Sequence, residues 1–511
     1  MTPTKAFQTR FDAAKAFRKE VEPFVKDILR FCCPGREHDF SSVGQRVPKE
    51  HDTDVFISIA EDLASDLAGD LITYYTPSEV KWAEYQVMVP IPEDQVSAIM
   101  ELVEDREETL GDLITASNYY DMAPQWAFEA SSHGTPAIWV DKAHLAQPIF
   151  FEAIPPHQIY LVPGHLGFLD RFRETRVPAD TLAALFDGWD VSLTDPTLVL
   201  KMKKPGVYVL CVWGFWLDWS DPGNPLWRCE ITVDGKRITP ETPLTLGPMA
   251  GSCPLLVGRF NPQVGKPWGR GSGWKALPDL RVLDKLDEVV LSGLDQSIMS
   301  TIIYPDDGFL DMSEGVEAGR AYPASRGFTR DQVYDLSRSV NVDQGWFTEE
   351  RIEERIRRSF YQDGPRQRGD TPPTAAQWID ERRRVQQRLG KPSAPLWSEL
   401  IYPMIQRVEY LAVKSGLMES AITLDGKSIN VMPISPLQKA QNQDKVMVAR
   451  SNLDMAVGIL QDQAGTVIDM VQTMKNIVKV SGDELTVIRN EQSAPTPSQG
   501  TPPNGPPAAT A

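Results

Sequence analysis

The stretch Gly364-Pro-Arg-Gln-Arg-Gly-Asp-Thr-Pro-Pro373, which precedes a helical pattern reaching Met418, decides how the rest of the chain is organised. Its glycines and prolines exclude a helix, because proline removes a backbone donor and clashes with the preceding turn. Thr374 and Gln377 then have the spacing of a capping box, so we expect a long helix to begin there. The helical pattern also contains Pro392, Pro395 and Pro403. These prolines predict that the helix is kinked or broken.

The charge of this stretch differs in sign from that of the whole chain. Residues 351–391 contain eleven Lys or Arg and six Asp or Glu, whereas the full chain has 52 basic and 70 acidic residues. One interpretation is a solvated helix face with i,i+4 ion pairs, namely Glu353–Arg357 and Glu354–Arg358. Arg366 and Arg368 lie in the loop without such a partner in sequence, so a basic loop that contacts a polyanion is the alternative.

Length and composition indicate an ordinary globular protein. A chain of 511 residues suggests roughly three domains, and 41% hydrophobic with 24% charged residues excludes a disordered or fibrous class. The five cysteines include no CxxC, which predicts reduced thiols. We expect no secretory signal and no membrane insertion, hence a soluble protein that is intracellular or assembled inside a cell. A net charge of −18 argues against gripping nucleic acid over the whole surface.

Changes in periodicity predict an α+β fold. Helical patterns cover residues 5–33, 54–76 and 93–133, and short β-rich runs with one helical segment at 178–186 occupy 137–264. A narrow apolar stripe over Leu277 to Ser300 predicts a helix about 36 Å long that packs side by side with neighbours. An irregular α/β insert, a helix starting at Thr348 as N-cap, and a hairpin over 421–433 follow. Helical patterns return at 437–460 and 467–480, and the tail from Ser493 is expected to be disordered.

Catalytic motifs are absent or incomplete, so we assign no catalytic residue, metal site or cofactor. Gly258 to Lys266 has the wrong spacing for a phosphate loop, and Gly269-Arg-Gly-Ser-Gly273 is better interpreted as a tight loop before the next helix. The six histidines lack metal-ligand spacing. Asp306, Asp307 and Asp311 leave open a metal-dependent nuclease, although Asp is common in such Gly-rich turns.

Several motifs, in this order along the chain, resemble the portal proteins of short-tailed, podovirus-type bacteriophages, also called head-to-tail connecting proteins. They are Ser131-Ser-His-Gly-Thr135, Phe151-Glu-Ala-Ile-Pro-Pro-His-Gln-Ile-Tyr-Leu161 with Gly167-Phe-Leu-Asp170, Trp268-Gly-Arg-Gly271 with Leu277-Pro-Asp-Leu280, and Thr371 to Ala376 with Leu396 to Pro403 and Arg407. Trp268 stands where the family has Tyr, and Gln377 stands where Glu is usual.

The resemblance implies a portal-type subunit with an α/β wing, a helical stem, a small α/β clip, a long kinked helix and a helical crown. The implied segments are wing 1–274, stem helix 275–301, clip 302–345, second stem helix 346–362, channel loop 363–374, long helix and return to the wing 375–435, crown 436–490 and tail 491–511. It further implies a ring of identical copies, usually twelve, at one capsid vertex, through which double-stranded DNA passes. Arg357, Arg358, Arg366 and Arg368 are then the residues expected to meet DNA.

The implied partners are the terminase packaging motor, tail adaptor proteins, and the major capsid and scaffolding proteins. The implied location is the virion, after assembly in the host cytoplasm. Besides the nuclease, a helical scaffold or tail component that does not conduct DNA remains an alternative.

Overall fold

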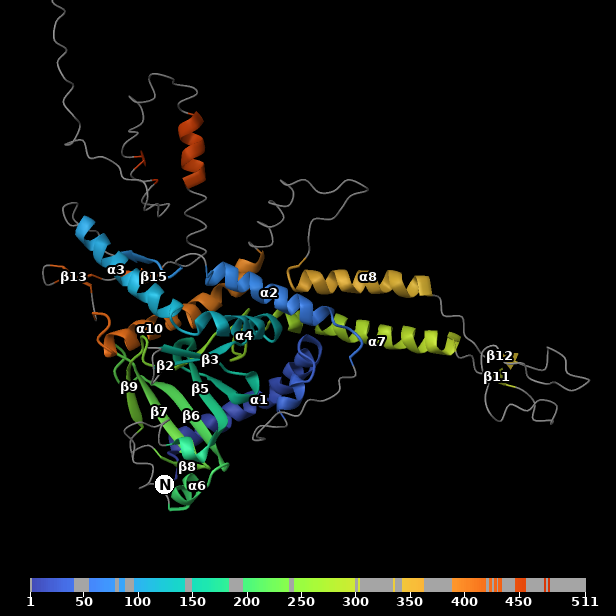
Figure 1. The fold of residues 1–511 in the computed structure, drawn as a ribbon, viewed down its shortest axis with the longest axis horizontal. Helices are drawn as coiled ribbons and strands as arrows, with labels where there is room; N and C mark the ends of the chain where they lie inside the picture. Colours follow the sequence, from blue (N-terminus) through green and yellow to red (C-terminus); the bar gives the residue numbers. More distant parts are fainter. Residues whose placement is uncertain are drawn as a thin grey trace, which may run out of the picture. The chain divides into compact units, whose positions relative to one another are not determined.

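The computed structural model describes residues 2–40, 55–78, 82–87, 96–142, 149–182, 196–238, 243–298, 302–303, 334–335, 342–362, 388–419, 422–424, 427–429, 431–433, 446–455, 473–474 and 477. The chain divides into two compact units, residues 1–433 and 434–511. The described elements of the first unit are a mixture of helices and antiparallel sheets (Figure 1). Within the second unit, 446–455 is helical.

An antiparallel sheet of order β4-β5-β6-β7-β8 forms the β-rich body, and β9 also pairs with β7. The strands are β4 (Ile159–Pro163), β5 (Leu169–Pro178), β6 (Tyr208–Asp218), β7 (Leu226–Val233), β8 (Lys236–Arg237) and β9 (Leu244–Pro248). Asp234 and Gly235 both have positive φ in the two-residue turn between β7 and β8, as a tight hairpin requires. The helix α6 (Pro196–Met202) precedes β6.

The first helix, α1 (Lys5–Cys32), packs its N-terminal half on one face of this sheet. Thr4 caps it by accepting a hydrogen bond from the Phe7 backbone N–H at 3.2 Å. Phe7 and Phe11 pack on Phe172 of β5. A side chain at Gly214 of β6 would meet the Phe7 ring at 2.6 Å, so the close fit of helix and sheet depends on glycine there.

A second sheet of order β10-β2-β3 lies beside a layer of helices. Its strands are β2 (Ala137–Lys142), β3 (Ile149–Ala153) and β10 (Leu255–Val257), and the helices are α2 (Ile59–Tyr75), α3 (Val96–Thr115), α4 (Tyr119–Ser132), α7 (Ser272–Ile298), α8 (Val342–Ser359) and α10 (Tyr402–Lys414). Their buried faces share one apolar core that includes Trp126, Leu280 and Ile356. This common core connects the long helices to the rest of the first unit.

Arg407 fastens α10 to the small sheet. Its guanidinium donates to the carbonyl oxygens of Val140 at 3.0 Å and Ser252 at 2.9 Å, and it contacts Asp141 at 3.2 Å. Arg407 is buried, so these acceptors replace the water that its charge has lost. The arginine noted in the sequence motif after Pro403 therefore has a structural role.

Short strand pairs complete the first unit. β1 (Tyr85–Val87) pairs with β15 (Val431–Pro433), β11 (Ile302–Ile303) with β12 (Tyr334–Asp335), and β13 (Ile422–Leu424) with β14 (Lys427–Ile429). The remaining short helices are the 3₁₀ turns Arg36–Phe40, Pro156–Gln158, His165–Gly167 and Ala179–Thr181. No helix among the described residues is long and apolar enough to cross a bilayer.

Several predicted elements need correction. The helix expected from Thr348 begins at Val342, and the one expected at Leu277 begins at Ser272 and continues through Pro278. Pro178, predicted to begin a helix, ends β5. The expected second strand of the C-terminal hairpin is two strands, β14 and β15, with different partners.

The predicted kinked helix is described only from residue 388 onward. Pro392 and Pro395 lie within helical residues and do not end the helix. The irregularity is a π turn at Trp397–Ile401, where the Tyr402 N–H bonds the Trp397 carbonyl. It lies directly before Pro403, which has no N–H to continue the regular pattern.

Candidate nucleic-acid interface

Helices α7 and α8 form a hairpin that leads to the basic segment of the sequence. Ile352, Ile356 and Phe360 on the α8 side are buried in the shared core together with Leu280 and Leu283 of α7. An ion pair of 2.9 Å between Arg355 and Asp279 joins the two helices at their partly exposed edge. Figure 1 shows the two helices side by side.

Two of the four predicted DNA-contacting arginines, Arg357 and Arg358, lie in the last turn of α8. Their side chains are about half exposed and lie 3.5 Å from Glu353 and 3.9 Å from Glu354, which are the i,i+4 pairs considered from the sequence. Exposed pairs of this kind contribute about 0–1 kcal/mol. The guanidinium groups can therefore exchange these partners for a phosphate at little cost.

The end of α8 directs the chain into that basic segment. The Gln362 N–H bonds the Arg357 carbonyl at 2.9 Å and the Tyr361 N–H bonds the Arg358 carbonyl at 3.3 Å, which together form a Schellman motif. Tyr361 occupies its left-handed position with φ 63°, where glycine is usual. Arg366 and Arg368, the other predicted site residues, lie outside the described residues.

The hairpin also contains a group of neighbouring carboxylates from both helices. Partial burial is the largest cause that raises the pKa of Asp287, which is about 6. The nearby negative charges of Glu349, Asp284 and Glu353 raise this pKa further. The hairpin therefore has negative charge between its helices and arginines at the end of α8, where the helix dipole favours cations.

The base of α7 is joined to the body by contacts of backbone against backbone. A β-carbon added to Gly269 would meet the Gly134 carbonyl at 2.0 Å, and one added to Gly271 would meet the Ser132 carbonyl at 2.4 Å. The Phe260 N–H bonds the Gly134 carbonyl at 2.8 Å, and the Arg270 N–H bonds the Phe260 carbonyl at 2.7 Å. The sequence motifs around residues 131–135 and 268–271 thus form one seam, which we call the glycine seam.

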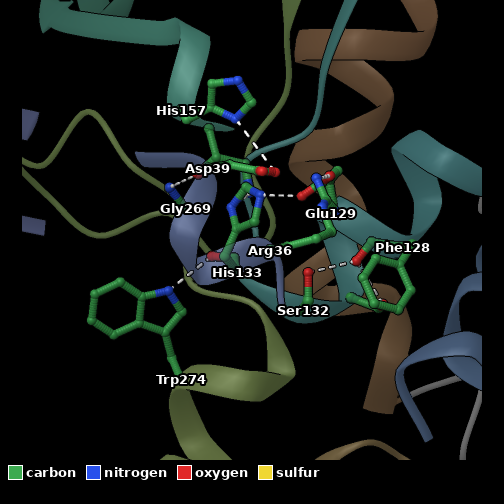
Figure 2. A network of polar contacts seen from close by, with 11 residues as sticks. Arg36, Asp39, Phe128, Glu129, Ser132, His133, His157, Gly269 and Trp274 are labelled. Atoms are coloured by element: carbon green, nitrogen blue, oxygen red, sulfur yellow. Dashed lines mark hydrogen bonds and ion pairs between the residues drawn. The ribbon is translucent and has the colours of Figure 1, made fainter. Parts of the chain in front are cut away.

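A buried polar network supports the glycine seam (Figure 2). Glu129 Oε1 accepts from Arg36 at 2.5 Å, and its Oε2 lies 2.6 Å from His133 Nε2. His133 Nδ1 accepts the Thr135 N–H at 3.2 Å, so its proton is on Nε2 and is donated to Glu129. Although burial alone raises the pKa of Glu129, Arg36 and His133 hold it at about 2. Trp274 of α7 donates to the His133 carbonyl at 2.8 Å.

These contacts assign structural rather than catalytic roles. In the part of the chain that the structure describes, no group of His, Cys, Asp or Glu is suited to hold a metal ion. Asp306, Asp307 and Asp311 lie outside the described residues. The tight loop predicted at residues 269–273 is shorter than expected, because residues 269–271 are irregular and Ser272 and Gly273 already belong to α7. All five cysteines are free thiols.

Sequence reasoning missed the network around Glu129. The spacing of Glu129 and His133 is a detectable i,i+4 signal within a helix. Arg36, however, is 93 positions away in sequence, and no local pattern connects it to Glu129.

Comparison with known proteins gives one family match. The profile described as "Bacteriophage head to tail connecting protein" matches residues 4–194 and 240–488. No curated protein matches. Among solved structures, the protein is similar to a chain of the structure described as "Neck of empty GTA particle computed with C6 symmetry". The two sequences are 12% identical, the TM-score is 0.33, and the match covers 76% of this protein and 86% of the other chain.

Proposed function

Because the chain belongs to the family of bacteriophage head-to-tail connecting proteins, a structural and non-enzymatic family of the virion, we propose that it is a portal protein. Identical copies form a closed ring at one capsid vertex, and the resemblance to portal proteins implies twelve copies. Double-stranded DNA passes through this ring during packaging and ejection. The ring docks the terminase during packaging and tail adaptor proteins afterwards, and it is assembled with capsid and scaffolding proteins in the host cytoplasm.

We assign the parts of such a portal to the segments of this chain. α7 and α8 are the two stem helices, residues 302–341 between them are the clip, and the β-rich body with α1 to α4 is the wing. Since α8 begins at Val342, the boundary between clip and second stem helix moves there from residue 345. Residues 363–374 are the channel loop, and the helical residues after 436 belong to the crown.

The family match over both the body and the helical part of the chain is the observation that carries this proposal. The charges are consistent with it. A chain of net charge −18 repels DNA over most of a channel wall, and a few arginines at the end of α8 and in the following segment supply local attraction. Passage of DNA requires weak contact, which this balance provides.

Electron microscopy of the purified full-length protein tests the ring. We expect annular particles with a central hole and a mass of several subunits. A protein that remains monomeric across a range of salt concentrations would refute the proposal.

The DNA contact is tested by charge reversal. Arg366→Glu combined with Arg368→Glu should leave ring assembly intact and reduce the amount of DNA packaged or retained. Lys203→Glu with Lys204→Glu, at two exposed lysines after α6, is the matched control and should package normally. Normal packaging by the arginine variant would show that these arginines do not meet DNA.

A further inference from the structure

Two exposed faces of the first unit differ in character: one is an apolar groove with an acidic rim, and the other is a row of lysines and valines on α7. The first is a groove of about 670 Å³, which we call the α2–α4 groove. Its lining includes Ala68 and Ile72 of α2, Phe128 of α4 and Ile154, with Glu61 and Cys33 at its edge. A β-carbon added to Gly69, which also lines it, would meet no atom within 4 Å, so the groove is open along α2. A volume and an apolar lining of this kind suit the side chains of another polypeptide.

The rim of the α2–α4 groove is acidic. Helix α2 contains Glu61, Asp62, Asp66 and Asp70 and no Lys or Arg. Glu61 itself lines the groove, and Asp62 and Asp66 are exposed beside it. Arg36 also lines the groove, but it is paired with Glu129 at 2.5 Å. The remaining charge around the groove is negative, so it is complementary to an occupant that brings apolar side chains together with positive charge.

The second face, which we call the α7 ridge, has this chemistry. Its members recur at heptad spacing on α7 and are all exposed: Lys275, Pro278, Val282, Lys285 and Val289. Val282 is 53% and Val289 55% exposed, so both offer apolar surface between the lysines of the ridge. The ridge is about 21 Å long at 1.5 Å per residue. Lys285 pairs with Glu288 at 2.7 Å, but such an exposed pair is easily exchanged.

We propose that the α7 ridge of one copy docks into the α2–α4 groove of the next copy around the ring, an inference that rests on the proposed function. A ring requires two different surfaces on each subunit that fit one another, and the ridge and the groove are such a pair. Copies with a net charge of −18 repel one another, so association needs local attraction of the kind that lysines on the ridge and carboxylates on the rim provide. Docking also covers the two exposed valines.

Cys33 provides a native reporter for the groove. It lines the groove and is partly exposed, whereas Cys32, Cys211, Cys229 and Cys253 are buried. We expect assembled rings to show at least a tenfold lower rate of maleimide labelling at Cys33 than dissociated subunits.

A crosslinking experiment then tests which face covers the groove. Subunits with Val289→Cys and Cys33→Ser, whose four native cysteines are buried, are assembled with differently tagged subunits that keep the native Cys33. A short bis-maleimide should produce covalent dimers that contain both tags, and such dimers can arise only between copies. Val264→Cys with Cys33→Ser is the matched control, because Val264 is a fully exposed valine away from α7, and it should give no dimer.

The outcomes separate this inference from the proposed function. Rings that crosslink through Val289→Cys and not through Val264→Cys support the docking. Rings in which Cys33 labels as fast as in free subunits, or in which Val289→Cys gives no dimer, overturn the docking and leave the portal assignment standing. Absence of rings in every variant and in the unmodified protein overturns both.

Discussion

Glu129→Gln is the substitution that tests the polar network most directly. The pKa of Glu129 falls from its ordinary 4.5 to about 2 in the folded protein, so its ionised form stabilises the fold by about 3 kcal/mol. Breaking a buried ion pair by removing one partner costs a similar 3–5 kcal/mol, because Arg36 then remains without its counter-charge. We expect the variant to lose about 3 kcal/mol at pH 7, measured from the urea midpoint of the dissociated subunit by tryptophan fluorescence.

The pH dependence follows from the same shift. Because the folded pKa of Glu129 lies below the unfolded one, its contribution is complete above about pH 4.5 and is lost as the pH falls towards 2. The gap between wild type and Glu129→Gln should therefore narrow in acid. Glu20→Gln is the control, since Glu20 also pairs with a basic residue, Lys266, but both side chains are more than half exposed, and it should cost about 1 kcal/mol or less. Equal losses for both variants at pH 7 would refute the reasoning.

Three further substitutions, the first with a matched control, test other parts of the structure with the same unfolding assay. Gly271→Ala should destabilise the folded protein by about 2 kcal/mol or more, because the added methyl group meets a backbone carbonyl. Its control, Gly111→Ala in α3, has open space around the methyl group and should stabilise the protein by about 0.5–1 kcal/mol. Similar effects of the two substitutions would contradict the close packing of the glycine seam. Asp287→Asn should be more stable than wild type at pH 7, because it removes a carboxylate whose charge is unfavourable in the folded protein. As the pH falls through about 6, Asp287 of the wild type takes up a proton and the difference in stability should shrink. An unchanged difference at pH 5 would count against a raised pKa of Asp287. Arg407→Met should lower the free energy of unfolding by about 3–5 kcal/mol, because it leaves buried carbonyl groups without a donor. A loss below about 1 kcal/mol would show that α10 is held by apolar packing alone.

Periodicity predicted the long helices well because their buried faces are simple. The predicted helix over residues 5–33 is observed as α1. The central strand β5 was missed. Its sequence Leu169-Asp-Arg-Phe-Arg places Asp170, Arg171 and Arg173 in buried positions, where they contact other polar groups from distant parts of the chain, so it lacks the apolar run typical of a buried strand.

The candidate site was predicted from the sequence in part. Arg357 and Arg358 could be placed on a helix with their i,i+4 partners, because these pairs are local. The acidic surroundings of Asp287 depend on the antiparallel arrangement of α7 and α8, and the network around Glu129 depends on a residue of the first helical region. Neither arrangement is encoded in local spacing, so both required the structure.

The glycine seam has a mechanical consequence. At the seam the backbone around Gly269 and Gly271 contacts the backbone around Gly134 directly, with no flexible side chain between them. A force on α7 is therefore transmitted to the segment that leads into β2 with little deformation. In the ring that we propose, a force applied at the far end of the α7–α8 hairpin would therefore be transmitted to the β-rich body of the subunit.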